Sequence, residues 1–148
     1  VQALVCQTSF PMPRRTAVGT DYNRVNLLMA VLEKRMGLHL GTCDAYVNVA
    51  GGMRIVEPAL DLALVAALIS SHYGRSLDAH TVLFGEVGLV GEVRAVSQAE
   101  RRVQEALKTG YTTIILPEAN RQAIVKAGTI PLEGVKLVGI KHIRDLTI

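Results

Sequence analysis

The chain has 148 residues, of which 49% are hydrophobic and 20% are charged, and its formal net charge is +3. These values exclude an intrinsically disordered chain and predict one domain, residues 1–148, with an apolar core. The longest apolar run, near residues 58–69, is shorter than the roughly 20 residues that cross a bilayer, so we expect no membrane partner.

The periodicity of apolar residues and the positions of glycine and proline predict the secondary structure. In chain order, the expected elements are a strand at 1–7, a loop or strand edge at 8–20, a helix at 21–36, a strand at 45–50 ending in a turn at Gly51–Gly52, a helix at 58–72, a β segment at 80–96, a helix at 97–110, a strand at 112–116, a helix at 117–126, a strand at 135–140 and a short helical tail at 141–146. This mixed order predicts an α/β (α+β) fold in which helices pack on a mixed sheet.

The first two helices carry the clearest local signals. Asp21 is a typical N-cap for helix 21–36, and Gly37 suits its C-terminal end. The apolar stripe of this helix comprises Val25, Leu28, Leu32 and Met36. Helix 58–72 is apolar on nearly every face except at Asp61, which predicts that this helix is buried.

Glycines and a capping pattern mark the segments that follow. Gly85, Gly88 and Gly91 recur at intervals of three, which favours a hairpin or a bent strand. Ser97 and Glu100 match the S-x-x-E capping box, in which each side chain bonds a backbone N–H at the start of a helix. We therefore expect the third helix to open at Ser97.

Cysteine and histidine are too sparse to suggest a metal site. Cys6 and Cys43 form no C-x-x-C pair, which argues against structural zinc, and so few cysteines favour a reducing cytoplasm. The scattered histidines are His39, His72, His80 and His142. The chain also has no G-x-x-x-x-G-K-[ST] motif, so we expect neither a metal nor a P-loop nucleotide site in this domain.

Residues 44–118 resemble the proteolytic domain of Lon. The segments that carry the likeness are Asp44–Gly52, Glu57–Ala63, Gly85–Arg94 and Gly110–Asn120. Active Lon reads Gly-Pro-Ser-Ala-Gly, with the serine as nucleophile, where this chain reads Glu-Pro-Ala, so the serine position holds Ala59. By counting along the motif, the position of the lysine base of Lon holds Glu100.

These two differences affect the chemistry that the resemblance implies. A methyl group cannot attack a carbonyl, and the carboxylate of Glu100 has no nucleophile beside it to activate. Ser70 lies eleven positions after Ala59, about 16 Å along a helix, so neither Ser70 nor Ser71 replaces the nucleophile. We therefore expect no catalytic residues and expect that this domain is not an enzyme.

A second resemblance covers nearly the whole chain. The sequence is similar to the C-terminal, Lon-protease-like domain of the bacterial RadA (Sms) family of DNA-repair proteins. The segments that carry this likeness are Pro13–Arg15, Gly19–Arg24, Ala30–Arg35, Asn48–Gly52, Glu57–Ala63, Ser70–Ser71 and Phe84–Leu89. In that family Glu-Pro-Ala stands in place of Gly-Pro-Ser, so the missing serine agrees with the resemblance.

The resemblance implies a longer parent protein, of which this chain is a fragment. That parent has a zinc-binding N-terminal segment, a RecA-like ATPase core and this domain at its C-terminus. ATP, Mg²⁺ and Zn²⁺ are implied for the upstream domains, and no cofactor is implied here. The parent is implied to form a homo-oligomeric ring, usually hexameric, on DNA and to drive branch migration during recombination. This domain would then be an inactive assembly scaffold and a non-specific DNA-contact module.

Basic side chains are the candidates for that DNA contact. Of the 16 basic residues 11 are arginine, which pairs with phosphate through two N–H groups. The densest candidates are Arg14, Arg15, Arg24, Lys34 and Arg35. They form one patch if the loop at 11–20 folds beside the first helix; otherwise they lie on a solvated face or in a subunit interface.

The remaining charges and the aromatic residues limit the mode of binding. A second basic cluster, Arg101, Arg102 and Lys108, fits the outer face of its helix. No run of aromatic residues interleaves the basic ones, so the sequence does not predict base stacking. Any binding is expected to be directed at phosphates, independent of base sequence and sensitive to salt.

Two other functions stay open on the sequence alone. One is an active Ser-Lys peptidase of the Lon type. The other is an oligomerisation scaffold that does not contact DNA.

Overall fold

The computed structural model describes residues 1–50 and 56–148, and the turn expected at Gly51–Gly52 lies outside these residues. The elements, in chain order, are β1 (Gln2–Gln7), β2 (Arg15–Val18), α1 (Tyr22–Met36), β3 (Cys43–Asn48), the 3-10 helix η1 (Pro58–Leu60), α2 (Asp61–Tyr73), β4 (Thr81–Leu83), β5 (Glu86–Val87), β6 (Val93–Arg94), α3 (Ala99–Thr109), β7 (Thr113–Pro117), α4 (Glu118–Ala127), β8 (Lys136–Ile140) and the 3-10 helix η2 (Ile143–Asp145). Helices and small sheets alternate, which confirms the α/β prediction.

The N-terminal sheet has the strand order β1-β3-β2, with β1 antiparallel and β2 parallel to β3. Residues 8–20, predicted as a loop or a strand edge, contain both, because β2 pairs with β3 at the edge of this sheet, from Arg15↔Ala45 to Val18↔Asn48. Both prolines of this segment precede β2, so each backbone N–H that the ladder needs is present.

The second sheet, β4-β7-β8, is entirely parallel, and α3 and α4 form part of its crossovers. Strand β7 is its centre and has apolar neighbours on both faces. Ile114 and Leu116 pack in one apolar cluster with residues of α3 and α4, whereas Ile115 packs against the other cluster with α1 and α2. This alternation follows from the two-residue period of a strand, and it explains why β7 is a continuous apolar run.

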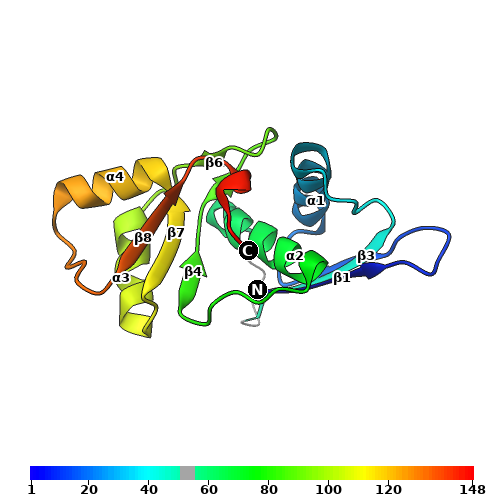
Figure 1. Ribbon diagram of the computed structural model, residues 1–148, viewed down its shortest axis with the longest axis horizontal. Coiled ribbons are helices and arrows are strands. Elements are labelled where there is room, and N and C mark those ends of the chain that lie inside the picture. Colours follow the sequence, from blue (N-terminus) through cyan, green and yellow to red (C-terminus); the bar gives the residue numbers. More distant parts are fainter. Residues whose placement is uncertain (51–55) are drawn as a thin grey trace.

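Helix α2 lies between the two sheets (Figure 1). It contacts β1 and α1 on one side and β4 and β5 on the other. Leu62, Leu64, Val65, Ala66 and Leu68 are all nearly inaccessible to solvent. The prediction of a buried helix is therefore confirmed, and its lack of a polar face follows from having a partner on each side.

The ends of the helices match the sequence signals in part. Asp21 caps α1 by accepting a hydrogen bond from the N–H of Asn23, and Gly37 ends α1 in the left-handed conformation, as predicted. The capping box of Ser97 and Glu100 is wrong: α3 follows Gln98, which has φ 56° and no capping side-chain bond. Glu100 instead accepts a hydrogen bond from the hydroxyl of Thr129. A partner distant in sequence has replaced the local one.

Two glycines in the left-handed conformation test how closely the N-terminal sheet packs. Gly19 (φ +82°) joins β2 to α1, and a Cβ there would overlap the carbonyl oxygen of Val49, whereas Gly37 (φ +70°) has nothing within 4 Å. We predict that Gly37→Ala costs about 1–2 kcal/mol from backbone strain alone. Gly19→Ala should cost about 1–3 kcal/mol more, because the overlap forces neighbouring backbone apart. Urea unfolding of both variants measures the difference, and equal losses would contradict this packing.

Candidate functional site

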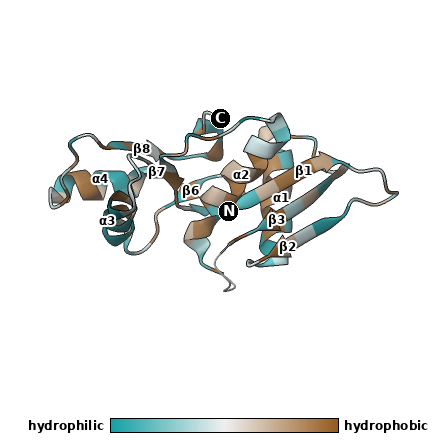
Figure 2. Cartoon of the chain, turned by 90° about the horizontal axis from the view of Figure 1, so that it is seen from below, coloured by the Kyte–Doolittle hydropathy of each residue, from teal (hydrophilic) through white to brown (hydrophobic). Residues whose placement is uncertain are grey.

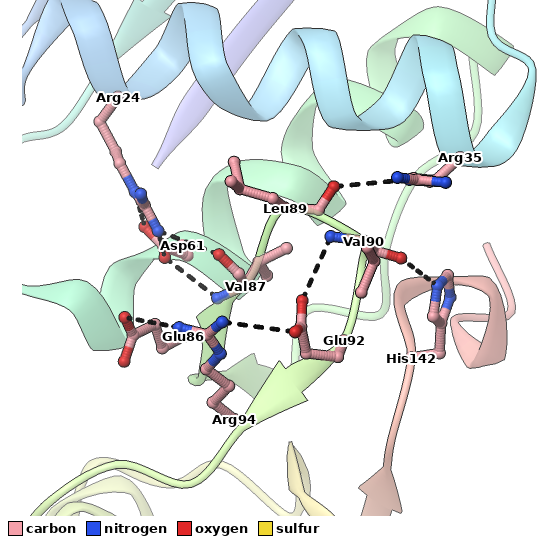
Figure 3. Close-up of polar contacts among 10 residues, drawn as sticks. All are labelled: Arg24, Arg35, Asp61, Glu86, Val87, Leu89, Val90, Glu92, Arg94 and His142. Carbon is pink, nitrogen blue, oxygen red and sulfur yellow. Dashed lines mark hydrogen bonds and ion pairs between the residues drawn. The ribbon is translucent and has the colours of Figure 1, made fainter.

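An ion pair joins α1 and α2 beside the β5–β6 hairpin (Figure 3). The guanidinium of Arg24 donates to both carboxylate oxygens of Asp61, with Nε to Oδ1 at 2.9 Å, and it also donates to the carbonyl of Val87 at 3.0 Å. Asp61 is 1% exposed. The bidentate geometry is the one that arginine and a carboxylate favour, and it leaves neither charge without a partner.

The same carboxylate also holds the start of the β5–β6 hairpin. Oδ2 of Asp61 accepts from the N–H of Val87 at 3.0 Å, so three elements meet at one side chain. The hydrogen bond to Asp61 is the largest cause that raises the pKa of Arg24, and burial opposes it. Arg24 is therefore a permanent cation that compensates the buried carboxylate.

The turn of the β5–β6 hairpin is held from outside by two side chains. Arg35 of α1 donates to the carbonyl of Leu89 at 3.5 Å, and the ring of His142 bonds the carbonyl of Val90 at 2.8 Å. Because Nδ1 of His142 accepts from the N–H of Arg144, the hydrogen lies on Nε2, which donates to Val90. The turn thus presents two exposed apolar side chains, Leu89 and Val90, on a backbone fixed at both corners.

A cavity of about 200 Å³ adjoins the ion pair. Its lining residues are Thr20, Asp21, Arg24, Val56, Glu57, Pro58, Leu60, Asp61, Leu64 and Glu86. Both neighbours of Ala59 line it, whereas Ala59 is itself 3% exposed and packed inward. The cavity therefore lies at the position where the Lon resemblance implies a peptidase site, but the methyl group of Ala59 does not face it.

The two positions of the expected dyad have separate surroundings. Ala59 is in η1, where its carbonyl accepts from the N–H of Gly85 at 2.9 Å. Glu100 is in α3 and bonds Thr129. Nearby, Arg102 of α3 forms an ion pair with Glu57 at 3.0 Å, so η1 and α3 are joined by a different pair of residues. Neither position supplies the hydroxyl or the amine of a Ser-Lys dyad.

The predicted basic patch is divided. Arg24 is engaged by Asp61, and it lies eleven residues, or about 16 Å along the helix, from Arg35. Arg15 donates to the carbonyl of Leu40, in the segment that follows α1. Lys34 is exposed in the last turn of the same helix. Arg14, Arg15 and Lys34 therefore belong to one end of the N-terminal sheet and α1, and Arg24 belongs to the other.

Sequence reasoning missed two side chains that matter for this site. Asp61 carried a signal, since a lone carboxylate in an apolar helix requires a buried cation as partner. Phe10 carried none: the guanidinium of Arg14 lies 3.6 Å from the centre of its ring, and only the path of the chain between β1 and β2 brings them together.

Comparison with known proteins identifies the family. The family model described as subunit ChlI of Mg-chelatase matches residues 14–120. The chain belongs to this ChlI family. The matched residues of the ChlI-family chain run from Arg14 to Asn120 and so include the ion pair, the hairpin and Ala59.

Relatives of the ChlI-family chain are named for DNA repair. DNA repair protein RadA of Halalkalibacterium halodurans and that of Bacillus subtilis are each 47% identical over 145 residues, which is 98% of this chain and 31% of the relative. DNA repair protein RadA of Synechocystis is 44% identical over 142 residues, or 95% of this chain and 26% of the relative. The chain thus spans about a third or less of these relatives. The likeness to Lon stays a prediction.

These matches correct one expectation. The prediction that the domain is not an enzyme is wrong, because the ChlI family is described as a subunit of an enzyme, Mg-chelatase, and the relatives are RadA proteins. The lack of a Ser-Lys pair excludes peptidase chemistry at Ala59 and Glu100, but it does not exclude other catalytic roles for the chain.

Residues 1–50 and 56–148 contain no helix with the length and apolar character that crossing a bilayer requires.

The buried ion pair generates a prediction for stability. Asp61→Ala should lower the free energy of unfolding by about 3–5 kcal/mol, because it leaves the Arg24 cation without its counter-charge in a partly buried site. The double variant Arg24→Met, Asp61→Leu should recover much of that loss. Chemical denaturation of Arg24→Met, Asp61→Leu and the double variant that combines them measures the coupling, and strictly additive losses would contradict the arrangement.

Proposed function

We propose that this chain is the part of a RadA-type DNA-repair ATPase that holds subunits together and contacts the DNA backbone. The observation that carries the proposal is 47% identity over 98% of the chain to proteins named DNA repair protein RadA. The enzymatic activity is that of the whole protein. Its ATPase domain, with ATP and Mg²⁺ as cofactors, and its zinc-binding segment belong to the two-thirds of the relatives that this chain does not span.

Three basic side chains at one end of the molecule support the DNA contact. Arg14 is exposed on the connection between β1 and β2, Arg15 begins β2, and Lys34 lies in the last turn of α1. Arginine in such a position pairs with phosphate oxygens without reading the bases. Arg24 is not part of this proposal, because its donors are used by Asp61 and Val87. A role on the chromosome of a bacterium requires a cytoplasmic location.

The turn of the β5–β6 hairpin supports the assembly role. Leu89 is 65% exposed and Val90 is 49% exposed, yet the backbone of this turn is held by His142 and Arg35. Rigid, exposed apolar side chains lose little entropy when a partner covers them, which suits a contact between subunits. In a homo-oligomeric ring, for which we propose six subunits, the same turn would meet a different surface of its neighbour.

The DNA contact is tested by removing charge at two separate places. Arg14→Ala, Arg15→Ala should weaken binding to a duplex of any sequence and lower the salt slope of log K by about two, since two phosphate contacts are lost. The matched control Arg101→Ala, Lys108→Ala removes the same charge from α3 and should leave the slope unchanged. Fluorescence anisotropy across a salt series gives both slopes. Equal slopes for the Arg14/Arg15 variant and the parent protein would favour a scaffold without DNA contact.

The assembly role is tested at the hairpin turn. Leu89→Ser, Val90→Ser should shift the mass measured by size exclusion with light scattering toward that of the single subunit, with the far-UV circular dichroism spectrum of the parent protein. Val125→Ser replaces an apolar side chain of α4 that is 50% exposed and serves as control. Retention of the parent's mass by the hairpin variant would exclude this turn as the contact.

A further inference from the structure

The connection between β1 and β2 places a phenylalanine and a methionine in solvent. It spans residues 8–14 and extends beyond the sheet at one end of the molecule (Figure 1, blue loop at the right). Phe10 is 42% exposed and Met12 is 78% exposed. Coloured by hydropathy in Figure 2, this end lies apart from the apolar interior around α2. These side chains therefore do not serve the core.

Hydrogen bonds from backbone N–H groups hold both ends of this loop in place. Thr8 donates its N–H to the carbonyl of Thr42 at 2.9 Å, and its hydroxyl accepts from the N–H of Phe10 at 3.1 Å. At the other end, the N–H of Arg14 donates to Oδ1 of Asp44 at 2.7 Å. Proline at 11 and 13 further restricts the chain between them. A loop held in this way presents its side chains without a large cost in conformational entropy.

The exposed ring is paired with a cation. The guanidinium of Arg14 lies 3.6 Å from the ring centre of Phe10, within the range of a cation–π contact. This contact orients the ring and places a positive charge over one of its faces, so that the opposite face is the one left for a ligand. Arg15 follows in the chain and adds a second charge at the start of β2. An aromatic face with adjacent arginines is the combination that binds an unpaired base together with its phosphate.

Charge distinguishes a nucleic acid from other occupants. Asp44 is 5% exposed and accepts from the backbone N–H of Arg14, and it forms no ion pair with the guanidinium of Arg14 or of Arg15, which contact the ring of Phe10 and the carbonyl of Leu40. A purely apolar partner would leave these arginines unpaired, whereas a polyanion pairs with them. The two exposed apolar side chains of the loop, Phe10 and Met12, are also a small contact for a protein interface, whereas the ring of Phe10 matches the face of one base.

We propose that Phe10, oriented by Arg14, is a stacking site for one unpaired base, so that this loop favours single-stranded over double-stranded DNA. The inference rests on the proposed DNA contact and specifies that single-stranded DNA binds more tightly than double-stranded DNA. The phosphates are bound by Arg14 and Arg15, and the ring adds a contact that only an unstacked base can make.

The test compares three probes of equal length: oligo-dT, an abasic strand that keeps the phosphates but has no bases, and a duplex. Stacking of one base contributes at least about 1 kcal/mol, which corresponds to about a fivefold change in affinity. Phe10→Leu should weaken binding to oligo-dT about fivefold or more, and leave binding to the abasic strand and to the duplex unchanged. Phe10→Tyr keeps the ring and should retain the parent's affinity for oligo-dT.

A matched control uses another exposed aromatic residue. Tyr73 is 49% exposed at the end of α2, with the guanidinium of Arg75 at 5.5 Å from its ring. Tyr73→Leu should leave binding to all three probes unchanged. Thermal midpoints equal to the parent's would show that Phe10→Leu is folded, and Phe10→Tyr provides a second measurement if it is not.

The outcomes separate this inference from the proposed function. If Phe10→Leu binds all three probes as the parent does, or weakens all three equally, the stacking site is overturned. The DNA contact survives that result when Arg14→Ala, Arg15→Ala still loses affinity for every probe. If the arginine variant binds every probe as tightly as the parent, the proposed DNA contact itself fails.

Discussion

The ion pair of Arg24 and Asp61 is the interaction on which the arrangement of the helices and the hairpin depends. A carboxylate that is 1% exposed needs a compensating charge, and here the guanidinium supplies it while also bonding the carbonyl of Val87. The N–H of Val87 returns a bond to the same carboxylate. One buried charge therefore fixes the positions of α1, α2 and β5 relative to one another, and apolar contacts alone would specify this less uniquely.

Arginine has a structural role in the interior of this protein and is available for ligand binding at its surface. Arg24 uses its donors inside the protein, so it contributes to the fold and not to a phosphate contact. Arg14 has an exposed guanidinium over Phe10, where it keeps its charge available to a ligand. Counting basic residues treats the two alike. The proposed DNA contact therefore rests on the fewer arginines whose charges are not neutralised by an internal carboxylate.

Ala59 occupies the position where the predicted resemblance to Lon implies a serine nucleophile. The segment around it retains its place beside a cavity, and its backbone is bonded to Gly85. An alanine here makes these backbone contacts, but its methyl group is not a nucleophile. The relationship to an enzyme subunit and to RadA proteins is compatible with this, because activity in a larger protein does not require a nucleophile at this position.

The sequence by itself determined the elements whose signals are local. Asp21 and Gly37 bounded α1, and the apolar run after Pro58 indicated a buried α2, because caps and periodicity act within a few residues. Only the tertiary structure decided which residues meet across long separations. It paired β2 with β3 and placed Glu100 where it bonds the hydroxyl of Thr129 instead of capping α3. It also brought Arg24 to Asp61 and Arg14 to the ring of Phe10. Such partners are chosen by the packing of the whole chain, which no local window of sequence contains.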